Sequence, residues 1–140
     1  MPSALNNSVA TAMLTDVGRV RNNNEDAITI DPELGLLLLS DGMGGYQAGE
    51  VASAIANETV LNVVRGESRG TAEEDRNQAN WPQTVLLEKA VTQAHKAIHE
   101  AAASRPECAG MGTTIVAVWL HQNRMSIAHV GDSRLYRFRI

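Results

Sequence analysis

The stretch LLLLSDGMGG, residues 36–45, joins an apolar run of strand length to a cluster of glycines. An unbroken apolar run of this length is typical of a strand that is buried on both faces. The run ends at Asp41, and a carboxylate at the rim of a core needs a charged partner or a bound cation. The glycines that follow, Gly42, Gly44 and Gly45, let the backbone turn sharply and come close to whatever Asp41 holds.

The residues before this run favour strands joined by turns. Residues 9–14 and 27–30 alternate between apolar and polar side chains, which predicts two strands. Between them, the three asparagines of residues 22–24 disfavour both helix and strand, so residues 19–26 are expected to form a structured polar loop. The turn signal in residues 31–35 pairs the second strand with the leucine run as a hairpin.

Two helices are predicted in the middle of the chain. Residues 48–64 carry an apolar stripe at helical spacing, and Gly66 is a stop signal after it. Residues 81–104 carry a second stripe, which ends at an Arg-Pro pair. The segment between the helices, residues 67–80, is polar and has no periodicity, so we expect an exposed loop there.

Three more strands are predicted in the last third of the chain. Residues 111–120 are rich in β-branched and apolar side chains, and residues 125–130 and 135–140 also have strand-like patterns. The order is strands, then two helices, then strands. This order favours an α+β layered fold over one wound from βαβ units.

The bulk properties fit one soluble globular domain of 140 residues. The net charge of -4 argues against nucleic acid or an anionic membrane as the main partner. The single cysteine, Cys108, excludes an internal disulfide and fits a reducing compartment. The N-terminus lacks the features of a signal peptide, and the leucine run is too short to cross a membrane. We therefore expect a cytoplasmic protein.

Several catalytic motifs can be excluded. The glycines after Asp41 lack the third glycine of a dinucleotide fingerprint, and no serine lies in a Gly-x-Ser-x-Gly elbow. His95 and His99 have the spacing of a zinc pair, but Lys96 stands where a metalloprotease helix carries glutamate. A zinc protease is therefore the weaker hypothesis, and we expect both histidines on a solvated flank of the helix. Cys108 is expected to be an inert thiol.

A set of hard oxygen ligands remains at predicted loop positions. Carboxylates of this kind suit Mg²⁺ or Mn²⁺ rather than zinc. Each one alone is explained by the capping of a turn, but together with Arg21 and the glycine cluster they indicate a metal site. The carboxylates are Asp16, Glu25, Asp26, Asp41 and Asp132.

Four segments of the chain resemble motifs of protein phosphatase 2C, the family of metal-dependent serine/threonine phosphatases. They are residues 15–26, 40–45, 110–114 and 129–134, and they occur in the family's order. Met43 replaces the histidine of eukaryotic relatives and matches the bacterial type. Each motif is weak by itself, whereas four in order are specific.

The resemblance implies roles for individual residues. Asp41 would bridge two metal ions, either Mn²⁺ or Mg²⁺, and Gly42 would offer its backbone carbonyl to one of them. Glu25 and Asp26 would hold metal-bound waters. Asp132 would lie near a third, weaker ion.

The resemblance also implies an activity and partners. The chain would hydrolyse phosphoserine and phosphothreonine in proteins with a metal-activated water. Arg21 would bind the substrate phosphate through its guanidinium, so Arg21 and Asp41 are the expected catalytic residues. The substrates would be phosphoproteins that a serine/threonine kinase modifies in bacterial signalling.

The implied architecture is an α/β/β/α four-layer sandwich. The family domain continues past residue 140 and supplies further aspartate ligands, so its C-terminal strands and helices are expected to be missing here. We expect residues 1–8 to be a flexible N-terminus and residues 9–140 to be the N-terminal part of a single phosphatase domain. The alternative is a non-catalytic module that binds a partner or swaps strands through exposed sheet edges.

Overall fold

The computed structural model describes residues 9–45, 47–68 and 81–140. The expectations for residues 1–8 and for most of the loop between the helices, residues 69–80, lie outside the described residues.

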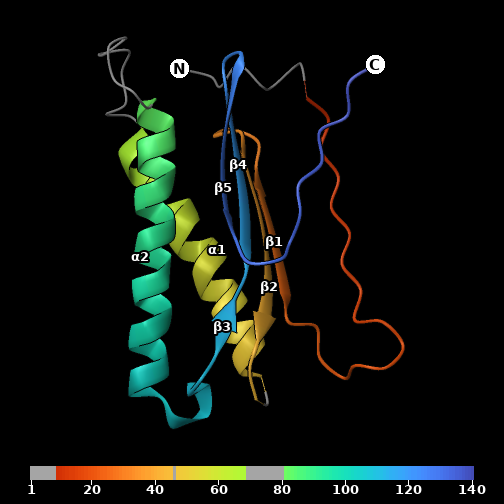
Figure 1. Ribbon diagram of the computed structural model, residues 1–140, viewed down its shortest axis with the longest axis vertical. Coiled ribbons are helices and arrows are strands. Elements are labelled where there is room, and N and C mark those ends of the chain that lie inside the picture. The colour runs from red at the N-terminus through yellow and green to blue at the C-terminus, as the bar shows by residue number, and fades with distance from the viewer. Residues whose placement is uncertain (1–8, 46, 69–80) are drawn as a thin grey trace.

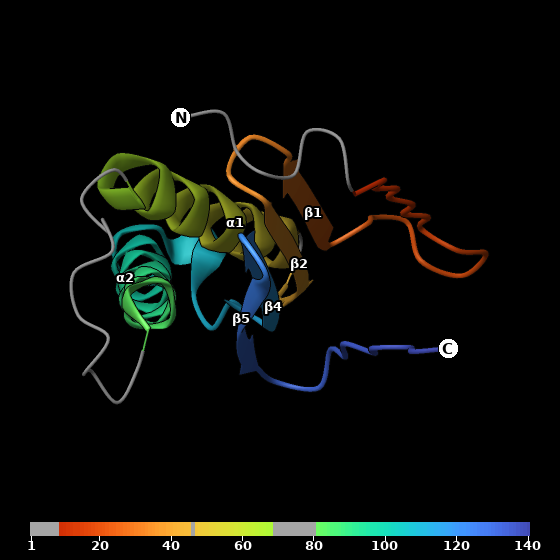
Figure 2. The same ribbon diagram turned by 90° about the horizontal axis from the view of Figure 1, so that it is seen from above.

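The fold is an antiparallel sheet with two long helices on one face, as Figures 1 and 2 show from two directions. This arrangement confirms the predicted α+β class. The other face of the sheet, which we call the open face, is covered by no helix among the described residues. The elements are β1 (Asp26–Asp31), β2 (Leu36–Met43), α1 (Ala48–Glu67), α2 (Pro82–Ser104), the 3-10 helix η2 (Pro106–Cys108), β3 (Gly112–Thr113), β4 (Ile115–His121) and β5 (Arg124–Val130).

The strand order is β1-β2-β4-β5, and the short β3 pairs with the end of β2. β1 and β2 form the predicted hairpin, in which Asp26 lies opposite Asp41. β4 runs antiparallel to β2, with Trp119 opposite Leu36. β2 therefore lies inside the sheet, and its C-terminal end presents Asp41 between β1 and the start of β4.

The core lies between the sheet and the helices. Leu36 and Leu38 of β2 are buried there, and so are alternate residues of β4. The helical stripes pack against them: Val60 of α1 and Leu87 of α2 are almost completely buried. The buried faces of the two helices were predicted correctly, because the apolar residues recur with the 3.6-residue period of a helix and so lie on the face that packs against the sheet.

The leucine run is buried on one face only, which corrects the prediction from its unbroken apolar pattern. Leu36 and Leu38 face the helices, whereas Leu37 and Leu39 alternate onto the open face. Leu39 is 40% exposed, because no described element packs over it. Asp41 lies on this same open face.

Two predicted strands are absent from the described fold. Residues 9–14 and 135–140 form no strand, although both have strand-like patterns. Both segments run on the open-face side of the sheet, away from the helices (Figure 2), and most of their side chains are exposed. A strand needs a partner for its backbone groups, and an alternating pattern does not provide one. The strand predicted for residues 111–120 is also divided, because Thr114 separates β3 from β4.

The hydroxyl and amide groups of three residues form a buried chain under the hairpin. Ser40 is fully buried, and its Oγ donates to Oδ1 of Asn57 at 2.7 Å. Nδ2 of Asn57 in turn donates to Oγ1 of Thr29 at 3.2 Å. These bonds join β1, β2 and α1 one residue before Asp41. They therefore fix the position of α1 along β2, the strand that carries the Asp41 carboxylate.

An ion pair joins the other end of the hairpin to α1. Nη2 of Arg65 lies 2.7 Å from Oδ2 of Asp31. Partial burial raises the pKa of Asp31, but the hydrogen bond from Arg65, the backbone N–H of Leu34 and the charge of Arg65 outweigh burial, so the net pKa is lowered. The ionised form of Asp31 is therefore stabilised by folding.

We expect Asp31→Asn to lower the free energy of unfolding by at most about 1 kcal/mol at neutral pH, because Arg65 is largely exposed. The pKa of Asp31 is lower in the folded than in the unfolded state. Its stabilisation of the fold is therefore complete above the unfolded-state pKa of about 3.9 and is lost as the pH falls through the folded-state pKa. Urea unfolding at pH 7 and pH 2.5 measures the loss of stability and its dependence on pH. Glu33→Gln, at an exposed position in the same turn, is the control. An equal loss at both pH values would contradict the assignment.

Among the described residues, neither long helix has an 18-residue apolar window of the kind that spans a bilayer.

Candidate metal centre

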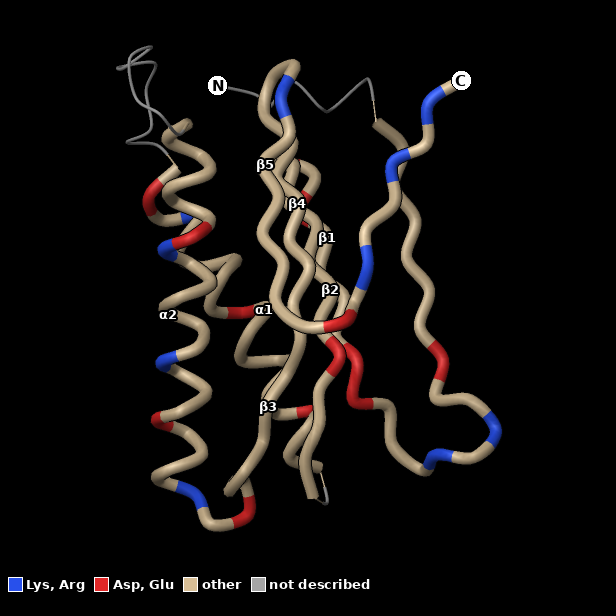
Figure 3. The backbone as a smooth tube through the Cα atoms, viewed as in Figure 1, with Lys and Arg blue, Asp and Glu red and all other residues tan. Residues whose placement is uncertain are grey.

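Two carboxylates meet at the open end of the β1–β2 hairpin. Asp26 begins β1 and Asp41 lies near the end of β2, and the antiparallel register places them directly opposite each other. Both side chains are exposed on the open face. Figure 3 shows this group of acidic residues where the ends of β1 and β2 meet the turn after β5.

The electrostatics of the pair favour a positive partner. The pKa of Asp26 is raised, first by desolvation, then by the charge of Asp41 and a side-chain hydrogen bond with Asp41, and last by the charge of Glu25. No lysine or arginine forms an ion pair with these three carboxylates among the described residues. Their mutual repulsion is relieved either by a shared proton or by a cation.

Glycines bring the start of α1 against this strand end. The backbone N–H of Gly42 donates to the carbonyl of Glu25 at 3.0 Å. A Cβ at Gly42 would overlap the carbonyl oxygen of Gly49 in the first turn of α1. A Cβ at Gly49 would lie 2.5 Å from Oε1 of Glu25, so the Glu25 carboxylate rests against the helix start. The positive end of the α1 dipole favours a negative group at that position.

Thr114 connects Asp41 to the turn that carries Asp132. Its Oγ1 accepts a hydrogen bond from the backbone N–H of Asp41 at 3.0 Å, and its own N–H donates to the Asp41 carbonyl. The same Oγ1 lies 2.6 Å from Oγ of Ser133. In the sequence, Thr114 is only one member of the motif of residues 110–114 and of the strand predicted for residues 111–120. Its role depends on the β2–β4 pairing, which no local pattern encodes.

Other predicted site residues lie apart from this pair. Arg21 is exposed in the loop before β1, and it makes no hydrogen bond or ion pair with a described residue. Figure 3 shows the basic residues of that loop extending away from the acidic group. Asp16 closes its own turn by accepting a hydrogen bond from the backbone N–H of Gly18 at 2.7 Å, so its ordinary capping role explains it.

The described residues fit a hard cation only in part. Asp26 and Asp41 offer two adjacent carboxylates, and backbone carbonyls lie beside them. No group of three or more His, Cys, Asp or Glu side chains in residues 9–45, 47–68 and 81–140 is arranged to hold a metal ion. Two divalent ions need six or more oxygen ligands each, so this set can supply only a fraction of them.

The histidine pair on α2 does not form a metal centre with other side chains. The rings of His95 and His99 lie edge to face with centroids 4.8 Å apart, and both residues are exposed. Their exposure agrees with the expected solvated flank of the helix, and no third ligand joins them among the described residues. Cys108 is buried in the small cluster under η2, where a thiol acts as an apolar group.

Comparison with known proteins assigns the fold. The profile of the family described as Protein phosphatase 2C matches residues 18–139. The chain is 35% identical over 128 residues to the serine/threonine protein phosphatase PstP of Mycobacterium tuberculosis, covering 91% of this chain and 22% of that protein. It is 36% identical over 126 residues to the serine/threonine phosphatase stp of Listeria innocua, covering 87% of this chain and 47% of stp.

Solved structures agree with these sequences. The crystal structure of PstP from M. tuberculosis matches with a TM-score of 0.68 and 35% identity, over 85% of this chain and 45% of the crystallised chain. The catalytic domain of PstP with two manganese ions also matches with a TM-score of 0.68 and 35% identity, over 85% of this chain and 46% of that domain. The chain belongs to the protein phosphatase 2C family, as its motifs indicated. It spans less than half the length of these relatives.

Proposed function

We propose that the chain acts in the hydrolysis of phosphoserine and phosphothreonine in proteins, with Mn²⁺ as its metal. The paired carboxylates Asp26 and Asp41 at the open end of the hairpin carry the proposal. They support it because two adjacent carboxylates without an ion-pair partner among the described residues can supply part of the ligands of a hard cation. The named activity of the relatives, serine/threonine phosphatase, supplies the reaction class.

Each residue would have a separate task. Asp41 would hold the metal, and the two hydrogen bonds between its backbone and Thr114 would keep the end of β2 in place. Gly42 would offer a backbone carbonyl. No residue larger than glycine fits between β2 and α1 at that position. Glu25 and Asp26 would accept hydrogen bonds from water around the metal, and Asp132 would approach from the turn after β5.

Bound divalent ions would supply a nucleophile at neutral pH and stabilise negative charge on the phosphoryl oxygens. The protein would contribute position and charge. Arg21 would pair with the phosphate once its loop lies over the hairpin end, since a guanidinium can bind two phosphate oxygens at once.

The test is phosphate release from a phosphothreonine peptide with millimolar Mn²⁺, together with Mn²⁺ binding followed by electron paramagnetic resonance. We expect Asp41→Asn to lower turnover about 100-fold or more and to weaken Mn²⁺ binding, because even outer-shell partners of a metal are worth about 10- to 100-fold. Glu33→Gln, remote in the β1–β2 turn, should change neither. No Mn²⁺-dependent release by the unsubstituted chain, or full activity in Asp41→Asn, would refute the proposal.

The finer assignments belong to the same proposal. Mg²⁺ would serve as an alternative to Mn²⁺, and a weaker third ion would lie near Asp132. The substrates would be products of a serine/threonine kinase in cytoplasmic signalling, which the single Cys108 thiol supports. The sheet edges β1 and β5 have unpaired backbone groups on their outer sides among the described elements, which supports self-association.

A further inference from the structure

A pocket lies at the end of the sheet opposite the acidic pair. It has a volume of about 180 Å³ and is lined by residues from the start of α2 and from the β4–β5 hairpin. Trp119 of β4 pairs with Leu36, five residues before Asp41 on β2. At roughly 3.3 Å per residue the pocket is therefore about 17 Å from Asp41. It is separate from the candidate metal centre.

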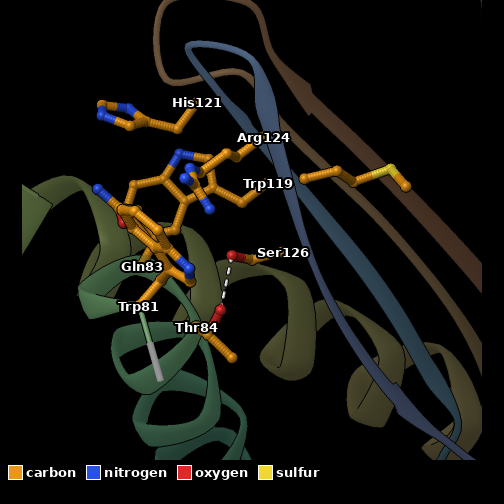
Figure 4. A pocket seen from close by; sticks show the side chains of 8 residues that line it. Trp81, Gln83, Thr84, Trp119, His121, Arg124 and Ser126 are labelled. Atoms are coloured by element: carbon orange, nitrogen blue, oxygen red, sulfur yellow. Dashed lines mark hydrogen bonds between the residues drawn. The ribbon is translucent and has the colours of Figure 1, made fainter. Parts of the chain in front are cut away.

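Strand geometry explains why the polar side chains gather there. Trp119 and His121 alternate onto the helix-facing side of β4, and Arg124 and Ser126 do the same on β5. Figure 4 shows these side chains facing Trp81, Gln83 and Thr84 from α2. A hydrogen bond of 2.9 Å between the hydroxyls of Thr84 and Ser126 ties the two sides together.

Arg124 is held in place by Trp81 and forms no ion pair with a described residue. Its guanidinium carbon lies 3.3 Å from the centroid of the Trp81 ring, a cation–π contact. Stacking uses the face of the guanidinium and leaves its N–H edges available for an in-plane oxygen pair. No aspartate or glutamate of the described residues lines the pocket. Within the described part of the chain, a fixed positive group therefore borders a space without negative charge.

The start of α2 adds donors on the same side. Pro82 has no N–H, and the first helical bond runs from the N–H of Val85 to the carbonyl of Trp81. The N–H groups of Gln83 and Thr84 thus precede the helical ladder, at the positive end of the helix dipole.

The side-chain amide of Gln83 is a further observation that indicates a ligand. The residue is only 8% exposed, and its amide makes no hydrogen bond with a described residue. In Figure 4 its side chain extends among the groups that surround the pocket, on the side of Trp119 and His121. Because no buried side-chain nitrogen or oxygen of the described residues lacks a hydrogen-bond partner, the amide atoms of Gln83 reach accessible space, where a ligand can meet them.

We infer that this pocket binds a small organic anion with a single aromatic ring and a carboxylate. The volume of about 180 Å³ is close to the roughly 150 Å³ that holds one benzene ring and is below the range of drug-sized sites. The carboxylate meets the N–H edges of Arg124 and the start of α2, the Gln83 amide bonds its second oxygen, and the ring fills the rest of the space between α2 and the β4–β5 hairpin. The inference is independent of the phosphatase proposal.

The chain reports on this pocket directly, because both of its tryptophans line it. We expect phenylacetate to change the tryptophan fluorescence of the 140-residue chain along a saturable curve. Phenylacetamide, which has the same shape without the charge, and acetate, which has no ring, should both bind at least ten-fold more weakly. Equal binding of phenylacetate and phenylacetamide, or a linear response without saturation, would overturn the inference.

Two substitutions assign the site. Arg124→Gln should raise the dissociation constant about ten-fold or more, as expected for the loss of a charge-assisted bond. Arg105→Gln, at an exposed position beyond the other end of α2, is the matched control and should leave it unchanged. Gln83→Glu puts a negative charge in the pocket and should abolish binding while the far-ultraviolet circular dichroism stays unchanged. Equal weakening in Arg124→Gln and Arg105→Gln, or full binding by Gln83→Glu, would overturn the inference.

Discussion

Gly42→Ala is expected to destabilise the fold by about 3 kcal/mol or more, in the upper range for overpacking. The new methyl group would overlap the carbonyl oxygen of Gly49 and lie 2.8 Å from that of Glu25. Both obstacles are backbone atoms, so no side-chain rotation relieves them. The strand end and the start of α1 would have to separate. Urea unfolding monitored by the fluorescence of buried Trp119 gives the change in the free energy of unfolding.

Gly45→Ala is the matched control for this experiment. It lies in the same glycine cluster, but a Cβ there meets no atom within 4 Å. We expect a change within about 0.5 kcal/mol, as for most unobstructed surface positions. If Gly42→Ala unfolded at the same urea concentration as Gly45→Ala, the close packing of β2 on α1 would not contribute to stability.

Asn57→Ala is expected to lower the free energy of unfolding by about 2–3 kcal/mol. The substitution removes the acceptor of the fully buried Ser40 hydroxyl and the donor to Thr29. A buried hydroxyl without a partner loses its hydration without compensation, which costs about 1–3 kcal/mol. The lost packing of Asn57 adds to this.

A double-mutant cycle separates the two contributions. Once Asn57 is replaced by alanine, Ser40→Ala removes the unsatisfied hydroxyl and should cost little or even restore stability. The double variant should therefore be no less stable than Asn57→Ala alone. Strictly additive losses would mean that the Ser40–Asn57 bond is not a coupled pair in solution.

The parts of the fold that sequence predicts well are those with local patterns. α1 and α2 follow from apolar stripes whose period matches a helix, and the β1–β2 hairpin follows from two apolar runs around a turn. The exposure of Leu37 and Leu39 was not predictable, because an unbroken apolar run does not tell how many faces of a sheet will be covered. The strands predicted for residues 9–14 and 135–140 were wrong because strand formation also depends on pairing with another strand, which is a tertiary property.

The candidate site divides in the same way. Asp41 and its glycines are recognisable from one contiguous motif, whereas Asp26 was expected in the loop before the strand and begins β1 opposite Asp41. The part played by Thr114 was not predictable, because its hydroxyl reaches Asp41 across 73 positions of sequence. The position of Arg21 relative to the pair does not follow from the sequence, because a motif gives the identity of a loop residue and not its position.

The place of β4 beside β2 also has a kinetic consequence. β1, β2 and α1 are consecutive in sequence, so their contacts close only short loops, whereas Trp119 must find Leu36 across both helices. Closing a long loop costs entropy before its contacts form, so folds dominated by such pairings assemble slowly. We expect the hairpin and α1 to form an early nucleus and the docking of β4 and β5 to limit the refolding rate. Asp26 and Asp41 would then face each other before the rest of the sheet is complete.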